Sequence, residues 1–438
     1  MAIEPQVLYS FQTGEGTLKG VHPGAGLTLG PDGNFYGTTR DGGSSNAGTI
    51  FRLTPGGAFT SLFAFSTTNG AAPQGGLVFG NDGNLYGTTA QGGPGNSGTA
   101  FMFSTNGTLT TLASLGGTNG ADPQCQLASD ANGSFYGTAP EQGANFSGTV
   151  FRVTTNGVLT TLVAFDDANG SSPEDGLTAG TDGNFYGTTA NGGSSGVGTV
   201  FRVTPGGDVT TLVSFNNTNG AIPLGGLVQG SDGNFYGTAG FGGSLGFGTI
   251  FRVTTNGALT TLFNFHFTDG QQPSTKLVFG PDGSLYGTTG LGGSTNNNPV
   301  GNGLGTVFRI TTDGVFTSLV LFQGTNGSNP SSPLIVGNDG NLYGTTQHGG
   351  PGGGGTVFRI LLTPQLTGIA KSVDGSVTIT GNGPPTSPFR LWASTLPSAP
   401  VASWAPLTNG VFAADGSFSY TDTAAAAQPA RFYRVSTP

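Results

Sequence analysis

One short text recurs seven times along this chain of 438 residues. The heptapeptide GTVFRVT stands at residues 198–204, and close copies begin at Gly48, Gly98, Gly148, Gly248, Gly305 and Gly355. The tyrosine of a Y-G-T triplet recurs every 50 residues from Tyr36 to Tyr286, and then after 57 residues at Tyr343. A fixed period of this length is typical of architectures in which each repeat forms one supersecondary unit.

Each repeat contains four short runs that favour β-strands. The fourth copy contains GLTAG, NFYGTT, TVFRVT and VTTLVSF, separated by tight x-D-G and P-G-G turns and by a long Gly/Ser/Asn loop. Four short strands in each unit of about 40 to 50 residues are typical of a β-propeller blade. The sequence therefore predicts an all-β fold with a seven-bladed β-propeller over residues 1–363.

The two ends of the repeat region complement each other. The last copy stops after its third strand, TVFRILLTP, whereas QVLYSF at residues 6–11 matches the fourth-strand text TTLVAF. We expect the strand at 7–11 to pair with residues 356–360 and to complete the last blade. A ring closed in this way has no open sheet edge that invites aggregation.

After Pro364 the period disappears. Residues 364–438 contain about five alternating runs, among them GSVTITGNG, PFRLWAST and GSFSYTDT, which predict a small C-terminal β-sandwich of the immunoglobulin or fibronectin kind. In FRLWAST, Phe389, Leu391 and Ala393 share one face, and Trp392 takes the other. Trp392 is therefore a candidate for an exposed stacking platform that contacts a ligand.

Charge and composition exclude several classes of partner. The net charge of −9 provides no basic stripe for phosphates, which argues against nucleic acid and anionic membrane surfaces. No apolar run approaches 18 residues, so no membrane-spanning helix is expected, and the lone Cys125 permits no internal disulfide. The start, MAIEPQVLYSF, lacks the pattern of a signal peptide, so the protein is either cytoplasmic or a mature form whose signal peptide is removed.

The repeat text resembles a bacterial family, the GloVer tandem-repeat proteins with a choice of C-terminal anchors. The resemblance covers residues 24 to about 362 through D-G-N-F/L-Y-G-T-T and G-T-V-F-R-V-T. It implies an extracellular or cell-surface protein, and it supplies no catalytic residues. The blade text is also similar, more weakly, to the D-G-N/S-L-W pattern of streptogramin-lyase-like propellers.

An arginine and an aspartate each recur at one repeat position. Copy two has Met102 in place of the arginine, and copy three has Asn132 in place of the aspartate. Because these exceptions fall in consecutive copies, we expect the arginine of one blade to meet the aspartate of the next, buried between blades. The predicted ion pairs are Arg52–Asp82, Arg152–Asp182, Arg202–Asp232, Arg252–Asp282, Arg309–Asp339 and, across the closure, Arg359–Asp32.

Acidic residues gather in the variable loops of the third and fourth blades. They lie on the face that carries the long loops, where a rigid scaffold commonly holds functional groups. Clustered carboxylates there are candidates for a polyhydroxylated ligand or for Ca²⁺, and the alternative is a solvated rim. The candidate ligand-binding residues are Asp122, Glu141, Asp166, Asp167, Glu174 and Asp175, of which Asp166, Asp167, Glu174 and Asp175 are the candidates for calcium.

Catalytic motifs are sparse. The G-x-S-x-G and G-x-G-x-x-G matches fall between two strands, whereas both motifs need a strand-to-helix turn. The chain has three histidines, too few for a His-rich metal site. Ring closure would bring His22 and His348 together, although without an adjacent carboxylate they are typical of ordinary loop residues.

These observations favour an exported, non-enzymatic binding or scaffold protein, with a polysaccharide or cell-surface component as partner and carbohydrate as the expected ligand class. No cofactor other than Ca²⁺ is expected, and no catalytic residue is assigned. One alternative is a propeller polysaccharide lyase or glycoside hydrolase that uses the acidic loop face. Another is a subunit of an extracellular assembly in which the C-terminal module docks on a neighbour.

Overall fold

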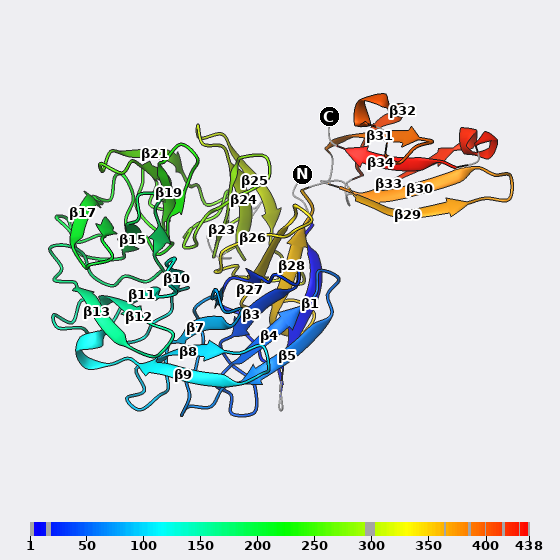
Figure 1. Cartoon of the computed structure of the whole chain (residues 1–438). Helices are drawn as coiled ribbons and strands as arrows, with labels where there is room; N and C mark the ends of the chain where they lie inside the picture. The colour runs from blue at the N-terminus through cyan, green and yellow to red at the C-terminus, as the bar shows by residue number, and fades with distance from the viewer. Residues whose placement is uncertain are drawn as a thin grey trace. The chain divides into compact units, whose positions relative to one another are not determined.

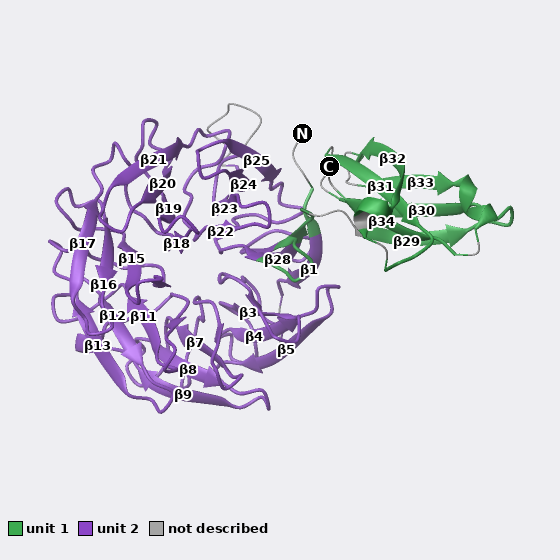
Figure 2. Ribbon diagram, turned by 45° about the horizontal axis from the view of Figure 1, so that its top comes forward, with its two compact units in different colours: residues 1–6, 336–342, 359–438 green, residues 7–335, 343–358 purple. Residues whose placement is uncertain are grey.

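A computed structural model describes residues 4–14, 19–293, 303–362, 365–383, 387–398, 400–413, 417–428 and 430–436. Its regular elements are β-strands and three short 3-10 helices, which confirms the all-β class (Figure 1). None of the described helices is long and apolar enough to cross a membrane. The chain divides into two compact units (Figure 2): Met1–Gln6, Val336–Leu342 and Arg359–Pro438 form the first, and Val7–Ile335 with Tyr343–Phe358 form the second.

Seven four-stranded sheets are present in the described residues, one for each repeat. The first three sheets, each in chain order, consist of β2 (Thr28–Leu29), β3 (Phe35–Thr39), β4 (Thr49–Leu53), β5 (Phe59–Ala64); β6 (Val78–Phe79), β7 (Leu85–Thr89), β8 (Thr99–Phe103), β9 (Leu109–Ser114); and β10 (Ala128–Ser129), β11 (Phe135–Ala139), β12 (Thr149–Val153), β13 (Leu159–Ala164), with the helix η1 (Gly117–Asn119) before β10.

The next three sheets have the same order. They consist of β14 (Thr178–Ala179), β15 (Phe185–Thr189), β16 (Thr199–Val203), β17 (Val209–Ser214); β18 (Val228–Gln229), β19 (Phe235–Ala239), β20 (Thr249–Val253), β21 (Leu259–Asn264); and β22 (Val278–Phe279), β23 (Leu285–Thr289), β24 (Thr306–Ile310), β25 (Phe316–Leu321). The seventh sheet has the order β1 (Gln6–Gln12), β28 (Gly353–Ile360), β27 (Leu342–Thr346), β26 (Ile335–Val336).

The repeated D-G-N-F-Y text forms a tight turn that the aspartate stabilises. In the fourth repeat, Gly183 has a φ of 81°, a left-handed conformation that glycine adopts without a steric penalty. Asp182 accepts a hydrogen bond from the backbone N–H of Asn184 (3.1 Å) and another from the Tyr186 hydroxyl (2.8 Å). The same motif therefore starts β15 and orients its tyrosine in one step.

The apolar core lies between neighbouring sheets. Tyr186 of the fourth repeat stacks on Phe235 of the fifth, with ring centroids 4.0 Å apart, and both side chains are buried. Within a sheet, Gly187 lies opposite Phe201, and a Cβ atom on Gly187 would lie 2.6 Å from the Cζ atom of that ring. The glycine of the Y-G-T triplet therefore makes room for the phenylalanine of GTVFRVT.

The last sheet and the first sheet pack as the other neighbours do. β1 lies beside β28, as the sequence predicted, and the Phe11 side chain is fully buried. Phe35 of the first sheet contacts Tyr343 of the seventh, with ring centroids 4.2 Å apart. The Thr345 hydroxyl donates to the Ala25 carbonyl oxygen over 3.2 Å, as Thr188 does to Gly225 between two internal repeats. The N-terminal strand thus completes the sheet of the last repeat.

The predicted Arg–Asp pairs between repeats do not form. Arg309 Nε lies 2.8 Å from Asp282 Oδ2 of its own repeat, not beside Asp339. Arg359 Nη1 lies 3.8 Å from Asp339 Oδ2 of its own repeat, and this arginine also donates to Gln6 rather than reaching Asp32. In the described chain, four arginines of this set form no ion pair within 4.0 Å: Arg52, Arg152, Arg202 and Arg252.

The strand register explains why these arginines and aspartates do not pair between repeats. Tyr186 lies directly opposite Arg202, so the tyrosine and the arginine of one repeat are neighbours, and the tyrosine hydroxyl reaches the turn aspartate. The same tyrosine–aspartate hydrogen bond forms at Asp32, Asp82, Asp232 and Asp282. The predicted pairs Arg52–Asp82, Arg152–Asp182, Arg202–Asp232 and Arg252–Asp282 are therefore wrong, because each of these aspartates serves its own sheet.

The residues after the repeats form two three-stranded sheets around one small core. Phe389 and Leu391 are buried in it, as the alternation predicted. Trp392 is half-buried, and its indole N–H donates to the Ser436 hydroxyl over 3.1 Å. The sheets have the orders β29 (Gln365–Lys371), β30 (Val377–Asn382), β33 (Ser417–Asp422) and β32 (Ala405–Val411), β31 (Pro388–Ser394), β34 (Phe432–Ser436), with the helices η2 (Val401–Ser403) and η3 (Thr423–Ala427).

Candidate functional site

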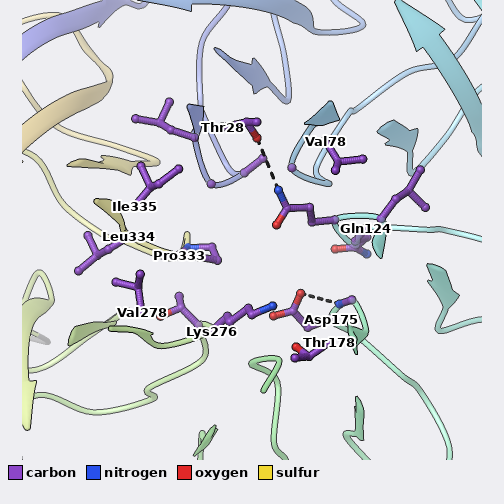
Figure 3. A pocket seen from close by; sticks show the side chains of 18 of the residues that line it. Thr28, Val78, Gln124, Asp175, Thr178, Lys276, Val278, Pro333, Leu334 and Ile335 are labelled. Carbon is purple, nitrogen blue, oxygen red and sulfur yellow. Dashed lines mark hydrogen bonds between the residues drawn. The ribbon is translucent and has the colours of Figure 1, made fainter. Parts of the chain in front are cut away.

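A cavity of about 790 Å³ lies between the first strands of the repeats. Figure 3 shows side chains from these strands and from the segments before them pointing into this space. Its inner ring is formed by the first residue of each first strand and contains two threonines and five apolar residues. This inner ring consists of Thr28, Val78, Ala128, Thr178, Val228, Val278 and Ile335.

A second ring, four residues earlier in each repeat, is more polar. It lies nearer the long loops, because the segment just before it pairs with the loop between the second and third strands, as at Val21 and Asp41. We call it the entrance ring; it consists of Gly24, Gln74, Gln124, Glu174, Leu224, Ser274 and Ser331. The repeats are nearly identical in their sheets but differ here, so the core does not dictate these residues.

Three of the six predicted acidic residues gather beside the entrance ring. Glu174 belongs to the ring, and burial raises its pKa to about 7, with further contributions from the carboxylates of Asp122 and Glu141. Asp122 accepts a hydrogen bond from the Gln124 side chain over 2.8 Å. Burial raises the pKa of Asp122 as well, while this hydrogen bond and Arg40 act in the opposite direction. The entrance therefore has a protonatable acid beside amide groups.

Asp175 lies deeper and is held by the backbone. Its Oδ1 atom accepts from the N–H of Gly176 (2.6 Å), and Oδ2 accepts from the N–H of Gly226 in the next repeat (2.5 Å). Burial raises the pKa of Asp175, while these hydrogen bonds and Lys276 favour the ionised form. Its carboxylate links two neighbouring repeats at the cavity wall.

Asp166 and Asp167 are exposed and serve loop geometry. Asp166 accepts from the Asn169 N–H over 3.0 Å, and Asp167 accepts from the Ser147 hydroxyl over 3.0 Å. Neither carboxylate contributes to the raised pKa of Glu174. Among the residues that the structure describes, no three His, Cys, Asp or Glu side chains form a metal-binding group. The expected gathering of Asp166, Asp167, Glu174 and Asp175 around one calcium ion is therefore not found.

A second polar group lies where the last repeat meets the first. The contact between the last and the first repeats brings His22 and His348 together, with the centroids of their imidazole rings 5.0 Å apart. His22 Nδ1 lies 2.9 Å from Asp41 Oδ2, a carboxylate that sequence reasoning missed. Burial lowers the pKa of His348, and His22 and Arg40 lower it further. Arg40 thus acts on both His348 and Asp122, which connects this group to the acidic side of the entrance.

Replacement of Glu174 by Gln is expected to stabilise the protein at pH 8 but not at pH 4. The folded-state pKa of about 7 lies above the ordinary value of 4.5, so the folded protein keeps a proton that the unfolded chain loses between these values. Stability therefore falls as pH rises through this window, and the variant should gain about 3 kcal/mol at pH 8. Denaturant unfolding at both pH values measures this gain. The exposed Asp208→Asn variant is the control, and an equal gain of Glu174→Gln at both pH values would argue against the raised pKa.

Sequence comparison places the repeats in a known family. The Gloeobacter/Verrucomicrobia repeat profile matches residues 3–183 and again residues 177–388. The chain belongs to the Gloeobacter/Verrucomicrobia repeat family. This confirms the resemblance drawn from the repeat motifs. The comparison with curated proteins gives no match for this Gloeobacter/Verrucomicrobia repeat protein.

Solved structures similar to this repeat protein are distant in sequence. A puromycin hydrolase matches with a TM-score of 0.52 and 13% identity, over 88% of this chain and 62% of that one. The extracellular domain of a putative hybrid two-component system from B. thetaiotaomicron matches with a TM-score of 0.49 and 13% identity, over 97% of this chain and 54% of that one. A putative 6-phosphogluconolactonase from Bacteroides fragilis matches with a TM-score of 0.49 and 16% identity, over 90% and 98%. The first likeness supports the propeller-like fold alone.

Proposed function

We propose that this chain is an exported, non-enzymatic binding or scaffold protein that takes a hydroxyl-rich carbohydrate at the entrance of the central cavity. The observation that carries the proposal is the composition of the entrance ring. The sheets are nearly the same in every repeat, whereas this ring differs, and Gln74, Gln124 and Glu174 place amide and carboxyl groups in it. Such groups both donate and accept hydrogen bonds, as sugar hydroxyls require. The extracellular location rests on the resemblance to exported choice-of-anchor proteins.

An apolar wall supports the choice of a sugar ring as the ligand. Leu224 belongs to the entrance ring in the fifth repeat, and Val228 of the same repeat belongs to the inner ring. A pocket with an apolar wall and a few placed polar groups is typical of small-ligand sites of this volume. The C–H face of a sugar fits the wall while its hydroxyls face the amides.

The finer architecture forms part of the same proposal. The seven sheets would serve as blades of a closed seven-bladed propeller over residues 1–363, which holds the entrance ring rigid. The two three-stranded sheets of residues 364–438 would form a separate β-sandwich. The shared packing of Phe35 with Tyr343 and of Phe235 with Tyr186 supports the closed ring.

Binding is expected to depend on the entrance ring and not on the C-terminal residues. A glycan-array screen followed by calorimetric titration should find a saccharide whose Kd rises at least tenfold in a Gln124→Ala/Glu174→Ala variant. A tenfold change corresponds to about 1.4 kcal/mol, the scale of one or two lost hydrogen bonds. Trp392→Ala is the matched control and should bind as wild type does. If Trp392→Ala loses binding while the double variant keeps it, the site is at Trp392 instead.

A second candidate function is supported by the group at the junction of the last and first repeats. A general base is available there in His22, which Asp41 contacts, and in the neighbouring His348. Arg40 supplies a cation beside them. A lyase acting on an acidic polysaccharide needs such a base to take the proton next to a carboxylate, and a cation to stabilise the resulting charge. A depolymerisation assay, with His348→Ala as the control, distinguishes this lyase from the non-enzymatic protein.

A further inference from the structure

Lys276 breaks the repeat pattern inside the cavity. It stands two residues before the first strand residue of the sixth repeat, where the other repeats carry Gly26, Gly76, Gln126, Gly176, Gly226 and Pro333. Four of these six residues are glycine, so the fold is satisfied without a side chain at this position. The long side chain of Lys276 is therefore not explained by the packing of the sheets.

The ammonium group of Lys276 forms no ion pair within the part of the chain that the structure describes. Its side chain points toward Asp175 (Figure 3), yet among the described residues it takes part in none of the four ion pairs. Burial lowers the pKa of Lys276, which Asp175 only partly offsets. Lys276 is half-buried in the cavity wall, and an ammonium partly withdrawn from water without an ion pair is costly, so an anion supplied by a ligand would compensate it.

Among the described residues, Asp175 stays short of an ion pair with Lys276, and backbone N–H groups hold both of its oxygens. One accepts from Gly176 and the other from Gly226, at 2.6 Å and 2.5 Å. Gln126, the other long side chain at this position, is also engaged, since its Nε2 donates to the Leu77 carbonyl oxygen over 2.7 Å. Lys276 is thus the charged group at this level that faces the cavity without a bond.

We propose that Lys276 makes the inner part of the central cavity a carboxylate subsite that takes the acid group of a uronic-acid saccharide. This inference rests on the proposed saccharide function and narrows its ligand class. Because Asp175 already places one carboxylate beside this single ammonium, a second monoanionic carboxylate suits the subsite better than a phosphate dianion. The amides of Gln74 and Gln124 lie two residues nearer the entrance in their repeats, where the ring hydroxyls of the bound residue would lie.

The lysines of this chain allow a direct test. The sequence contains three: Lys19, Lys276 and Lys371. Reductive methylation with a ¹³C label keeps the charge and yields few NMR signals, and the one lost in a Lys276→Met variant belongs to Lys276. We expect this signal to shift on addition of an oligoglucuronate or of acetate, but not of a neutral glucose oligosaccharide of equal length. The Lys19 and Lys371 signals should stay in place.

Calorimetry on the same samples separates the inference from the proposed function. The Kd for the oligoglucuronate should rise at least tenfold in Lys276→Met, and the Kd for a neutral saccharide should stay within twofold. If neutral saccharides bind and the Lys276 signal ignores both acids, the inference fails while the proposed function stands. If acetate moves the signal and no saccharide of either kind binds, the carboxylate subsite holds and the proposed saccharide ligand is wrong. The wild-type signal reports on the site whether or not the variant folds well.

Discussion

Removal of residues 1–12 is expected to produce a protein that aggregates and melts at a markedly lower temperature. The deletion takes away β1, so β28 is left with an unpaired edge where the last repeat meets the first. Phe11 is fully buried against the first sheet, where its ring lies 5.6 Å from that of Phe51. The cut therefore exposes both backbone hydrogen-bonding groups and apolar side chains.

Two controls separate closure from simple loss of chain. Removal of residues 1–4 leaves β1 intact and should change neither solubility nor melting temperature. A synthetic peptide of residues 4–14, added to the protein without residues 1–12, should restore part of the melting temperature. Unchanged solubility and melting temperature after the larger deletion would show that β1 does not hold the ring together.

The pairing of glycine with phenylalanine inside each sheet predicts the largest single-residue effect. Phe201 is fully buried and contacts Phe165, with ring centroids 5.1 Å apart. Phe201→Ala should lower the free energy of unfolding by about 3 to 5 kcal/mol through lost burial and a residual cavity. Gly187→Ala should cost about 1 to 3 kcal/mol, because the new methyl group overlaps the ring of Phe201.

A double variant tests whether these two residues act as one unit. Gly187→Ala with Phe201→Leu gives the new methyl group space that the smaller side chain leaves, so it should cost less than the sum of the single variants. Denaturant unfolding measures all of these changes. Strict additivity would show that the glycine is required for another reason.

The strands and the closing strand were predictable because the repeat period carries them. The texts of the first three strands recur in all seven copies. The text of the fourth strand recurs in six copies, and QVLYSF near the start of the chain supplies the one that the last copy lacks. The structure places β1 beside β28 accordingly. The hydrophobic pattern and the turn residues are local signals, so they predict the strands without knowledge of long-range contacts.

The Arg–Asp register was not predictable from the period. Every repeat arginine from Arg52 to Arg309 lies between two repeat aspartates in the chain, and Met102 and Asn132 pointed to the wrong choice. In the third repeat, Asp130 takes over the role of the missing turn aspartate and accepts from the Tyr136 hydroxyl over 3.1 Å. The substitutions at Met102 and Asn132 are therefore independent of each other, and they give no information about which aspartate each arginine contacts.

The site was predictable only in part, because loop contacts carry it. Asp122, Glu141 and Glu174 meet as the acidic composition of the loops suggested, whereas Asp166 and Asp167 serve their own loops. Asp41 reaches His22 through an isolated bridge between loops, which has no sequence signal. Lys276 did have a sequence signal, because it stands at a position where four of the other six repeats have glycine.

A crystal structure of the protein soaked with the best ligand from the glycan array tests the central claim most directly. We expect one sugar residue within the entrance ring, hydrogen-bonded to Gln124 and Glu174, with any acid group on Lys276. Saccharide density at Trp392, or an empty cavity at a concentration that saturates binding in solution, would contradict this account.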